Sequence, residues 1–355
     1  MYTQTESTQN DDSSSIHPSP AARAPARPRR VRRRLPGTAL LARLVDDPAL
    51  APDWLQVCAA ALESAAQPDR GLPARLLDVA DLLAQLDRLY TARLAEAQQW
   101  FDSPAAAGRS LHATLPLWTE ALFAEAGALL RGGLLPEMAA GGIRILPVTQ
   151  VDETQRAWLQ CYFMQHIYPL LTPLAVDPGR PFPFISSDSL NLLVELRRPE
   201  AAREARTTLF ARVKIPSRTA RLVAIPPHIA AHAPGTKSGP QAATYVYSAD
   251  LVRFFVHELF PGVPVRHVYL FRVIRGETPW PDVTRRGASR HRRQEDRPVV
   301  RLDVERRMAE AVLRWLVEHL QTPPHGVIHH DSLLEISGLP AVARLADGAL
   351  AGAPR

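Results

Sequence analysis

His329, His330 and Asp331 form the one local group in this sequence that combines two histidines with a carboxylate. A histidine that accepts a phosphoryl group needs an orienting carboxylate and nearby cations that stabilise the transferred charge. Two imidazoles could also share a metal ion, but adjacent side chains on a strand point to opposite faces, which argues against chelation. We expect the group to lie in a loop or at the end of a short strand. We therefore assign no catalytic residue and no metal ligand.

Four cations on two predicted strands are better candidates for contacts with anions. Arg212 and Lys214 alternate with apolar residues and so share one face of a strand, whereas Arg272 and Arg275 flank the apolar part of another. Guanidinium groups suit phosphate oxygens because their fork pairs two oxygens at once. If these faces point outward, the four side chains form a strip that contacts a polyanion. The alternative is that they are ordinary solvated strand faces.

Several other kinds of site are not indicated. The sequence has no Gly-rich lysine loop for nucleotides, no Gly-x-Ser-x-Gly element and no Cys-x-x-Cys pair. Cys58 and Cys161 lie far apart, so we expect free thiols in a reducing compartment. No apolar run approaches the roughly 18 residues of a membrane span, and the N-terminus lacks an apolar signal core. We expect a cytoplasmic protein without a membrane span.

Positive charge is concentrated in two short stretches. The formal net charge is +6, and seven arginines fall between residues 23 and 34. A second basic run covers residues 285–293. Residues 1–36 contain few large apolar side chains, so we predict a disordered basic tail. This tail could hold nucleic acid or another polyanion by counterion release, or it could be a solvated tail without a partner.

The distribution of apolar residues predicts an α+β protein, with an N-terminal helical bundle followed by a domain with a largely antiparallel sheet. Residues 37–146 carry helical spacing, for example at Leu76, Leu83 and Tyr90. Residues 147–189 read as a helix and a proline-rich connector, and residues 190–322 as the α+β domain. Within that domain we predict strands at 190–196, 208–215, 222–225, 245–247, 267–275 and 299–304, and helices at 249–260 and 305–321.

Several blocks occur in an order that is typical of one family. They include LLPEMAAGGIRIL at 134–146, YFMQHIYPLLTPLAVDPGRPFPFISSDSLNL at 162–192, YLFRVIR at 269–275 and VVRLDVERRM at 299–308. This series resembles the N-terminal and middle, or head, domains of the polyphosphate kinase family, which makes inorganic polyphosphate from ATP. The resemblance covers residues 134–340 well and residues 37–133 poorly.

The resemblance also indicates what this sequence lacks. The family's C-terminal half, with two phospholipase-D-like domains and the phosphorylated histidine, has no counterpart here. Residues 323–355 read as a remnant that leads to that half. The family's Asn-Leu-Asp-Glu-Phe-Phe type motif, whose asparagine reaches the adenine nucleotide, does not occur between residues 37 and 133. The resemblance therefore implies no cofactor in this chain, and ATP and Mg²⁺ for the family's catalytic half.

Two functional hypotheses follow. The first is a truncated, non-catalytic polyphosphate kinase module for oligomerisation or polyphosphate binding, which would associate with further copies of itself or with a separate catalytic chain. The second is a stand-alone basic scaffold that binds polyanions or nucleic acid. A decayed copy without a selected activity is a third reading.

Overall fold

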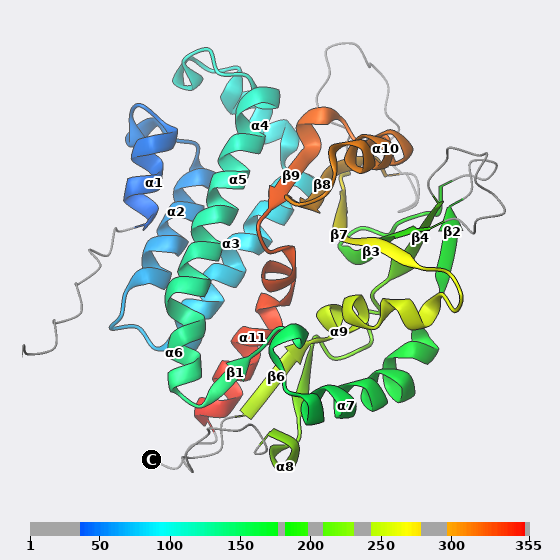
Figure 1. Cartoon of the computed structure of the whole chain (residues 1–355). Helices are drawn as coiled ribbons and strands as arrows, with labels where there is room; N and C mark the ends of the chain where they lie inside the picture. Colours follow the sequence, from blue (N-terminus) through cyan, green and yellow to red (C-terminus); the bar gives the residue numbers. More distant parts are fainter. Residues whose placement is uncertain (1–35, 177–181, 198–208, 231–242, 278–296, 352–355) are drawn as a thin grey trace, which may run out of the picture. The chain divides into compact units, whose positions relative to one another are not determined.

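The N-terminal part of the chain forms helices because its apolar residues recur every three or four positions. A computed structural model of the chain describes residues 36–176, 182–197, 209–230, 243–277 and 297–351 (Figure 1). The first helices are α1 (Pro36–Leu44), α2 (Asp53–Ala66), α3 (Leu72–Ala92), α4 (Leu94–Phe101), α5 (Leu111–Leu129) and α6 (Leu135–Ala140). Leu76, Leu83 and Tyr90, which carry the predicted helical spacing, are buried on α3.

Helix α5 contains a proline and continues past two glycines. It begins at Leu111, so Pro116 lies inside the helix. At Gly132 and Gly133 it passes into a π-helical turn, Leu130–Leu134, that leads directly into α6. A wider turn of this kind absorbs the two glycines without ending the helix.

Strands alternate with helices in the rest of the chain. Within the described residues, one sheet has six strands in the order β2-β4-β3-β7-β8-β9. Their bounds are β2 (Pro173–Val176), β3 (Ser189–Leu196), β4 (Leu209–Lys214), β7 (Val265–Arg275), β8 (Val299–Glu305) and β9 (Val327–His330). These neighbours pair antiparallel, apart from the parallel pair β8 and β9. The structure therefore confirms the predicted fold class, with helices first and a largely antiparallel sheet after them.

A smaller sheet joins distant parts of the sequence. Its described strands are β1 (Ile143–Ile145), β5 (Leu222–Ile225) and β6 (Ala243–Tyr247), with β6 in the middle. Strand β1 pairs parallel to β6, and β5 pairs antiparallel to it. The short apolar run after α6 is thus a strand, which lies outside the region where strands are predicted from the sequence.

Helices cover both faces of the larger sheet. Leu192 and Leu193 are neighbours on β3 and point to opposite faces. Leu192 belongs to a core with Phe163 and Leu251, which come from the segment after α7 (Glu153–Tyr162) and from α9 (Ser248–Phe254). Leu193 belongs to a core with Leu316 of α10 (Glu310–Leu320).

The remaining helical segments are α8 (Pro227–Ala230), the π turn Phe163–Ile167, and 3₁₀ turns at Pro48–Leu50, Pro104–Ala106, Val148–Gln150, Tyr168–Leu170, Val256–Leu259 and Pro324–Gly326.

The helices and the larger sheet share one apolar core. This core contains residues of α2, α3 and α5 together with Ile274 of β7, Val300 of β8 and Ile328 of β9. Helix α11 (Leu333–Ala351) adds Leu339 and Val342 and lies beside α3 (Figure 1). The segment 323–355, expected to be a remnant, thus contains β9 and α11, which are packed into the core. None of the helices that the structure describes has the length and apolar content needed to span a membrane.

Candidate functional site

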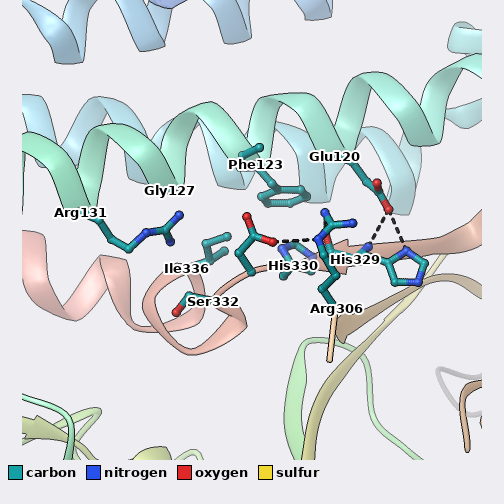
Figure 2. Close-up of a pocket in the computed structure, with 11 residues that line it drawn as sticks. Glu120, Phe123, Gly127, Arg131, Arg306, His329, His330, Ser332 and Ile336 are labelled. Atoms are coloured by element: carbon teal, nitrogen blue, oxygen red, sulfur yellow. Dashed lines mark hydrogen bonds and ion pairs between the residues drawn. The ribbon is translucent and has the colours of Figure 1, made fainter. Parts of the chain in front are cut away.

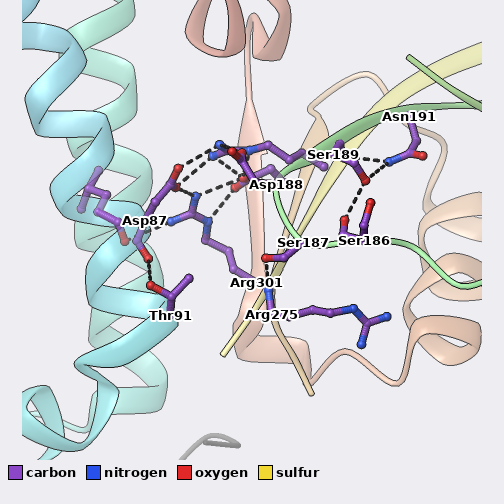
Figure 3. Close-up of polar contacts among 12 residues, drawn as sticks. Asp87, Thr91, Ser186, Ser187, Asp188, Ser189, Asn191, Arg275 and Arg301 are labelled. Carbon is purple, nitrogen blue, oxygen red and sulfur yellow. Dashed lines mark hydrogen bonds and ion pairs between the residues drawn. The ribbon is translucent and has the colours of Figure 1, made fainter. Parts of the chain in front are cut away.

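A cluster of buried charges lies where α3 meets the larger sheet. Arg272 of β7 is directly opposite Asp303 of β8 in the strand register. Arg301 precedes Asp303 by two residues, so both side chains lie on the same face of β8. Asp87 of α3 reaches towards this face, and Asp188 comes from the turn before β3 (Figure 3). The sheet register and one helix therefore bring five charged groups together.

Arg272 contacts three carboxylates at once. Its Nη1 atom is 3.0 Å from Asp87 Oδ2 and 3.0 Å from Asp188 Oδ1, and its Nη2 atom is 2.8 Å from Asp303 Oδ2. Asp188 can form this contact because its backbone adopts a left-handed conformation, with φ of 56°, a conformation that aspartate tolerates better than most residues. The side chain of Arg272 is 8% exposed, so these carboxylates take the place of water.

Arg301 also contacts several partners. Its Nη2 atom pairs with Asp87, its Nε atom is 3.0 Å from Asp303 Oδ1, and its Nη1 atom donates to the carbonyl oxygen of Leu86 at 3.3 Å. The guanidinium carbon lies 4.8 Å from the ring centroid of Tyr90. The side chains of both Arg301 and Asp303 have 0% exposure.

The arrangement keeps these groups ionised. Burial by itself raises the pKa of Asp303, but Arg301, Arg272 and His330 more than offset this and hold the pKa far below its usual range. Burial by itself lowers the pKa of Arg272, but Asp87, Asp303 and Asp188 outweigh it and raise the pKa. The cluster is thus a set of mutually neutralised charges that fastens α3 to β7 and β8.

The two adjacent histidines at the end of β9 point in different directions, as expected (Figure 2). His330 is buried, and its Nε2 atom is 2.9 Å from Asp303 Oδ1. The ring of His329 is 34% exposed, and its Nδ1 atom is 2.9 Å from Glu120 Oε1 of α5. The backbone N–H of His329 donates to the same oxygen at 2.8 Å. Burial of Glu120 raises its pKa, but these hydrogen bonds hold the pKa below its ordinary value.

A small pocket beside these histidines has room for little more than a water molecule. Its cavity volume is about 10 Å³, and Arg131, Arg306 and Asp331 contribute to its lining. Arg306 Nε donates to Asp331 Oδ1 at 2.8 Å, so the third residue of the predicted group is ion-paired at the surface. This pocket is too small for a nucleotide.

A larger cleft lies next to the charge cluster. Its volume is about 320 Å³, and it is bounded by α3, by α11 and by residues at the turn before β3. Asp87, Asp188 and Arg272 form its charged wall, and Arg221 and Arg344 also line it. Of these five charged residues, Arg272 alone is predicted from the sequence to contact anions.

The structure does not bring the four predicted cations into one strip. Arg212 is opposite Leu193 and Arg272 is opposite Leu190, so the two arginines lie on opposite faces of the sheet. Arg212 is buried, and its Nε atom donates to Asn191 Oδ1 at 2.8 Å. Lys214 is exposed, and its Nζ atom donates to Ser186 Oγ at 2.9 Å.

Arg275 donates hydrogen bonds to the backbone of two segments, the connector and the stretch before β8. Its Nε atom donates to the Ile185 carbonyl at 2.8 Å, its Nη1 atom donates to the Arg297 carbonyl at 2.6 Å, and its guanidinium lies 4.6 Å from the Phe184 ring centroid. Polyanion contacts at Arg212, Lys214, Arg272 and Arg275 stay a prediction. The arginines at 23–34 and the basic run at 285–293 lie outside the described residues.

No described residues form a group of three or more histidine, cysteine or acidic side chains placed to hold a metal ion. The acidic side chains that do gather, Asp87, Asp188 and Asp303, are paired with arginines and do not offer the open oxygen ligands that Mg²⁺ requires. The residues of the cluster therefore do not fit a magnesium site.

Comparison with known proteins agrees with the fold. The family profile of the polyphosphate kinase middle domain matches residues 154–342. The polyphosphate kinases of Mycobacterium tuberculosis (strain H37Rv) and Mycobacterium bovis (strain AF2122/97) are each 30% identical over 300 residues. These alignments cover 81% of this chain and 40% of each relative. The crystal structure of polyphosphate kinase from Porphyromonas gingivalis superimposes with a TM-score of 0.63 at 20% identity, over 81% of this chain and 40% of that one.

A helical layer on a largely antiparallel sheet is therefore a fold that this chain shares with part of that solved structure. The chain belongs to the polyphosphate kinase family. It spans about 40% of the length of the curated relatives that it matches.

Proposed function

We propose that this chain is a rigid, non-catalytic module of a polyphosphate kinase and that it does not transfer phosphate by itself. In the family reaction, the γ-phosphate of ATP passes reversibly to inorganic polyphosphate. The observation that carries the proposal is the charge cluster at Asp87, Arg272, Arg301 and Asp303. Its guanidinium groups are buried and already paired, so they act on the fold and not on a transferring phosphoryl group.

The position of the cluster supports a mechanical role. It connects α3 to β7 and β8, which lie about two hundred residues further along the chain. Breaking one pair would leave a buried charge without a partner, so the two layers resist sliding over each other. A module of this kind presents its surfaces in a fixed geometry to a catalytic part.

An exposed edge supports association with a second copy of the chain. Strand β2 is at one end of the sheet order, and no further described strand pairs with its outer side. Leu174 on this strand is 38% exposed and Leu170 just before it is 54% exposed. Association through this edge would remove both side chains from water, and Leu174→Lys should shift the oligomer towards monomer in multi-angle light scattering.

The decisive experiment is ATP-dependent polyphosphate synthesis by the purified chain, with a test for acid-labile phosphohistidine in the same samples. We expect neither product. His329→Gln is the informative variant because Glu120 orients this partly exposed ring. His267→Gln, at an exposed position on β7, is the matched control.

Synthesis that disappears in His329→Gln and persists in His267→Gln would overturn the proposal and identify His329 as the phosphorylated residue. A chain that makes polyphosphate only after a separate catalytic chain is added would support it.

A further inference from the structure

The cleft between α3 and α11 has the features of a ligand site that the proposed function does not use. Its volume of about 320 Å³ is within the range of small-molecule pockets, about 300 to 1,000 Å³. One wall is apolar and includes Leu83 and Ala84 of α3 and Ile336 and Ala341 of α11. Such a wall favours a ligand that has an apolar part.

Two arginines give the cleft unpaired positive charge. Arg221 comes from the turn before β5, and Arg344 comes from α11. The guanidinium groups of Arg272 and Arg301 nearby already form ion pairs with Asp87, Asp188 and Asp303. By contrast, neither Arg221 nor Arg344 has a side-chain ion-pair or hydrogen-bond partner among the described residues.

A third polar group in the cleft also lacks a partner. The Oγ atom of Ser337 is buried and has no hydrogen-bond partner within the described structure, although Ser337 lines the cleft. A buried hydroxyl without a partner is costly, because it has lost its hydrogen bonds to water. A rotation of this side chain towards the cleft would let a ligand oxygen accept a hydrogen bond from it.

We propose that this cleft binds a small phosphate monoester whose organic part is apolar. A phosphate group carries a charge of about −1.5 to −2 and three acceptor oxygens, which suits two guanidinium groups from different elements and one hydroxyl. A carboxylate carries a single negative charge and would balance only one of the two guanidinium charges. The organic part packs against the apolar wall of α3 and α11.

The probe for this site is 1-naphthyl phosphate, with binding followed by calorimetry on the full chain. We expect saturable binding at one site, and binding at least about tenfold weaker for 1-naphthol, which lacks the phosphate, and for inorganic phosphate, which lacks the rings. Arg344→Gln and Arg221→Gln should each weaken binding of the naphthyl phosphate by about tenfold or more. Ala341→Phe should weaken it by narrowing the cleft.

Arg314→Gln is the control, because it makes the same change of charge on the exposed face of α10. It should leave the affinity unchanged. The three cleft variants change partly or fully exposed positions, and thermal unfolding will verify that each is folded. Equal affinities of the wild type, Arg344→Gln, Arg221→Gln and Ala341→Phe would overturn the proposal, as would the absence of saturable binding. None of these results depends on phosphate transfer or on association of the chain.

Discussion

Arg301 is a fully charged residue at a position with no exposure to water, and its surroundings explain how the fold tolerates it. Asp87 and Asp303 supply opposite charge, the Leu86 carbonyl accepts a further hydrogen bond, and Tyr90 covers the guanidinium plane. Such a buried pair adds little net stability over apolar residues of similar size. Stability is lost when one partner is removed and the other charges are left buried without it.

We therefore expect Arg301→Met to lower the free energy of unfolding by about 3–5 kcal/mol, because it leaves Asp303 and Asp87 short of a cation. Equilibrium unfolding in urea measures this loss. Arg314→Met breaks an ion pair whose two side chains are 74% and 78% exposed, and should change stability by less than about 1 kcal/mol. Equal losses of stability in the two variants would show that the buried carboxylates do not depend on Arg301.

His325 makes the stability of the protein depend on pH. Burial and the nearby His112 lower its pKa from 6.5 to about 4. Between these two values the unfolded chain binds a proton that the folded chain does not, so stability falls as the pH decreases through this window. In urea unfolding, His325→Gln should lose less stability across it than the wild type. His267→Gln, at an exposed position, should behave like the wild type.

At the scale of elements, α11 depends on a close approach to the smaller sheet. A Cβ atom added at Gly338 would lie 2.7 Å from Tyr247 Cδ1 and closer still to Cε1. Tyr247 is buried at the end of β6, so its ring has little room to move. Glycine is required here for the contact and not for its backbone freedom.

Gly338→Ala should accordingly lower the melting temperature, because α11 must shift away from β6. Gly348→Ala on the same helix is the matched control, since a Cβ atom there meets nothing within 4 Å. That substitution should leave stability unchanged or raise it by up to about 1 kcal/mol, the ordinary difference between alanine and glycine in a helix. Similar melting temperatures for the two variants would contradict the proposed contact.

Helix α11 also shows where prediction from the sequence fails. The interior of α11 contains Gly338, Pro340 and Gly348, and all three disfavour a helix by local propensity. The helix forms because Leu339, Val342 and Ala343 are buried in the shared core, and tertiary packing of this kind overrides propensity. By contrast, β3, β7 and β8 were predicted almost to the residue, since their apolar alternation is a local signal.

The charge cluster could be predicted only in part from the sequence, because it too depends on tertiary packing. Arg301 and Asp303 alternate with valine and leucine in β8, which is an unusual pattern and could have indicated buried charges. Asp87, however, comes from a helix more than 180 residues away, and nothing local pairs it with Arg272. The strand register and the packing of α3 had to be known first.

At the scale of the whole molecule, net charge governs the interaction with polyanions. Seven arginines fall between residues 23 and 34 of a chain whose net charge is +6. Deleting residues 1–36 should weaken binding of a polyphosphate chain and flatten its dependence on salt concentration, because fewer counterions are released. Binding measured by fluorescence anisotropy over a salt series tests this. Deleting residues 1–22, which include no lysine or arginine, should preserve the slope; an equal slope in both deletions would exclude the arginine run as the contact.

The shared core has a consequence for how the protein is made on the ribosome. Helices α2, α3 and α5 emerge first, but β8, β9 and α11, which complete their apolar core, come at the end of the chain. The contact between Arg301 and Leu86 spans 215 residues, and a ribosome that adds about 5–20 residues per second takes about 10–40 s to cover that distance. During this interval the apolar faces of the early helices have no final partner. Nascent chains of this protein should therefore depend on ribosome-associated chaperones until α11 has been synthesised.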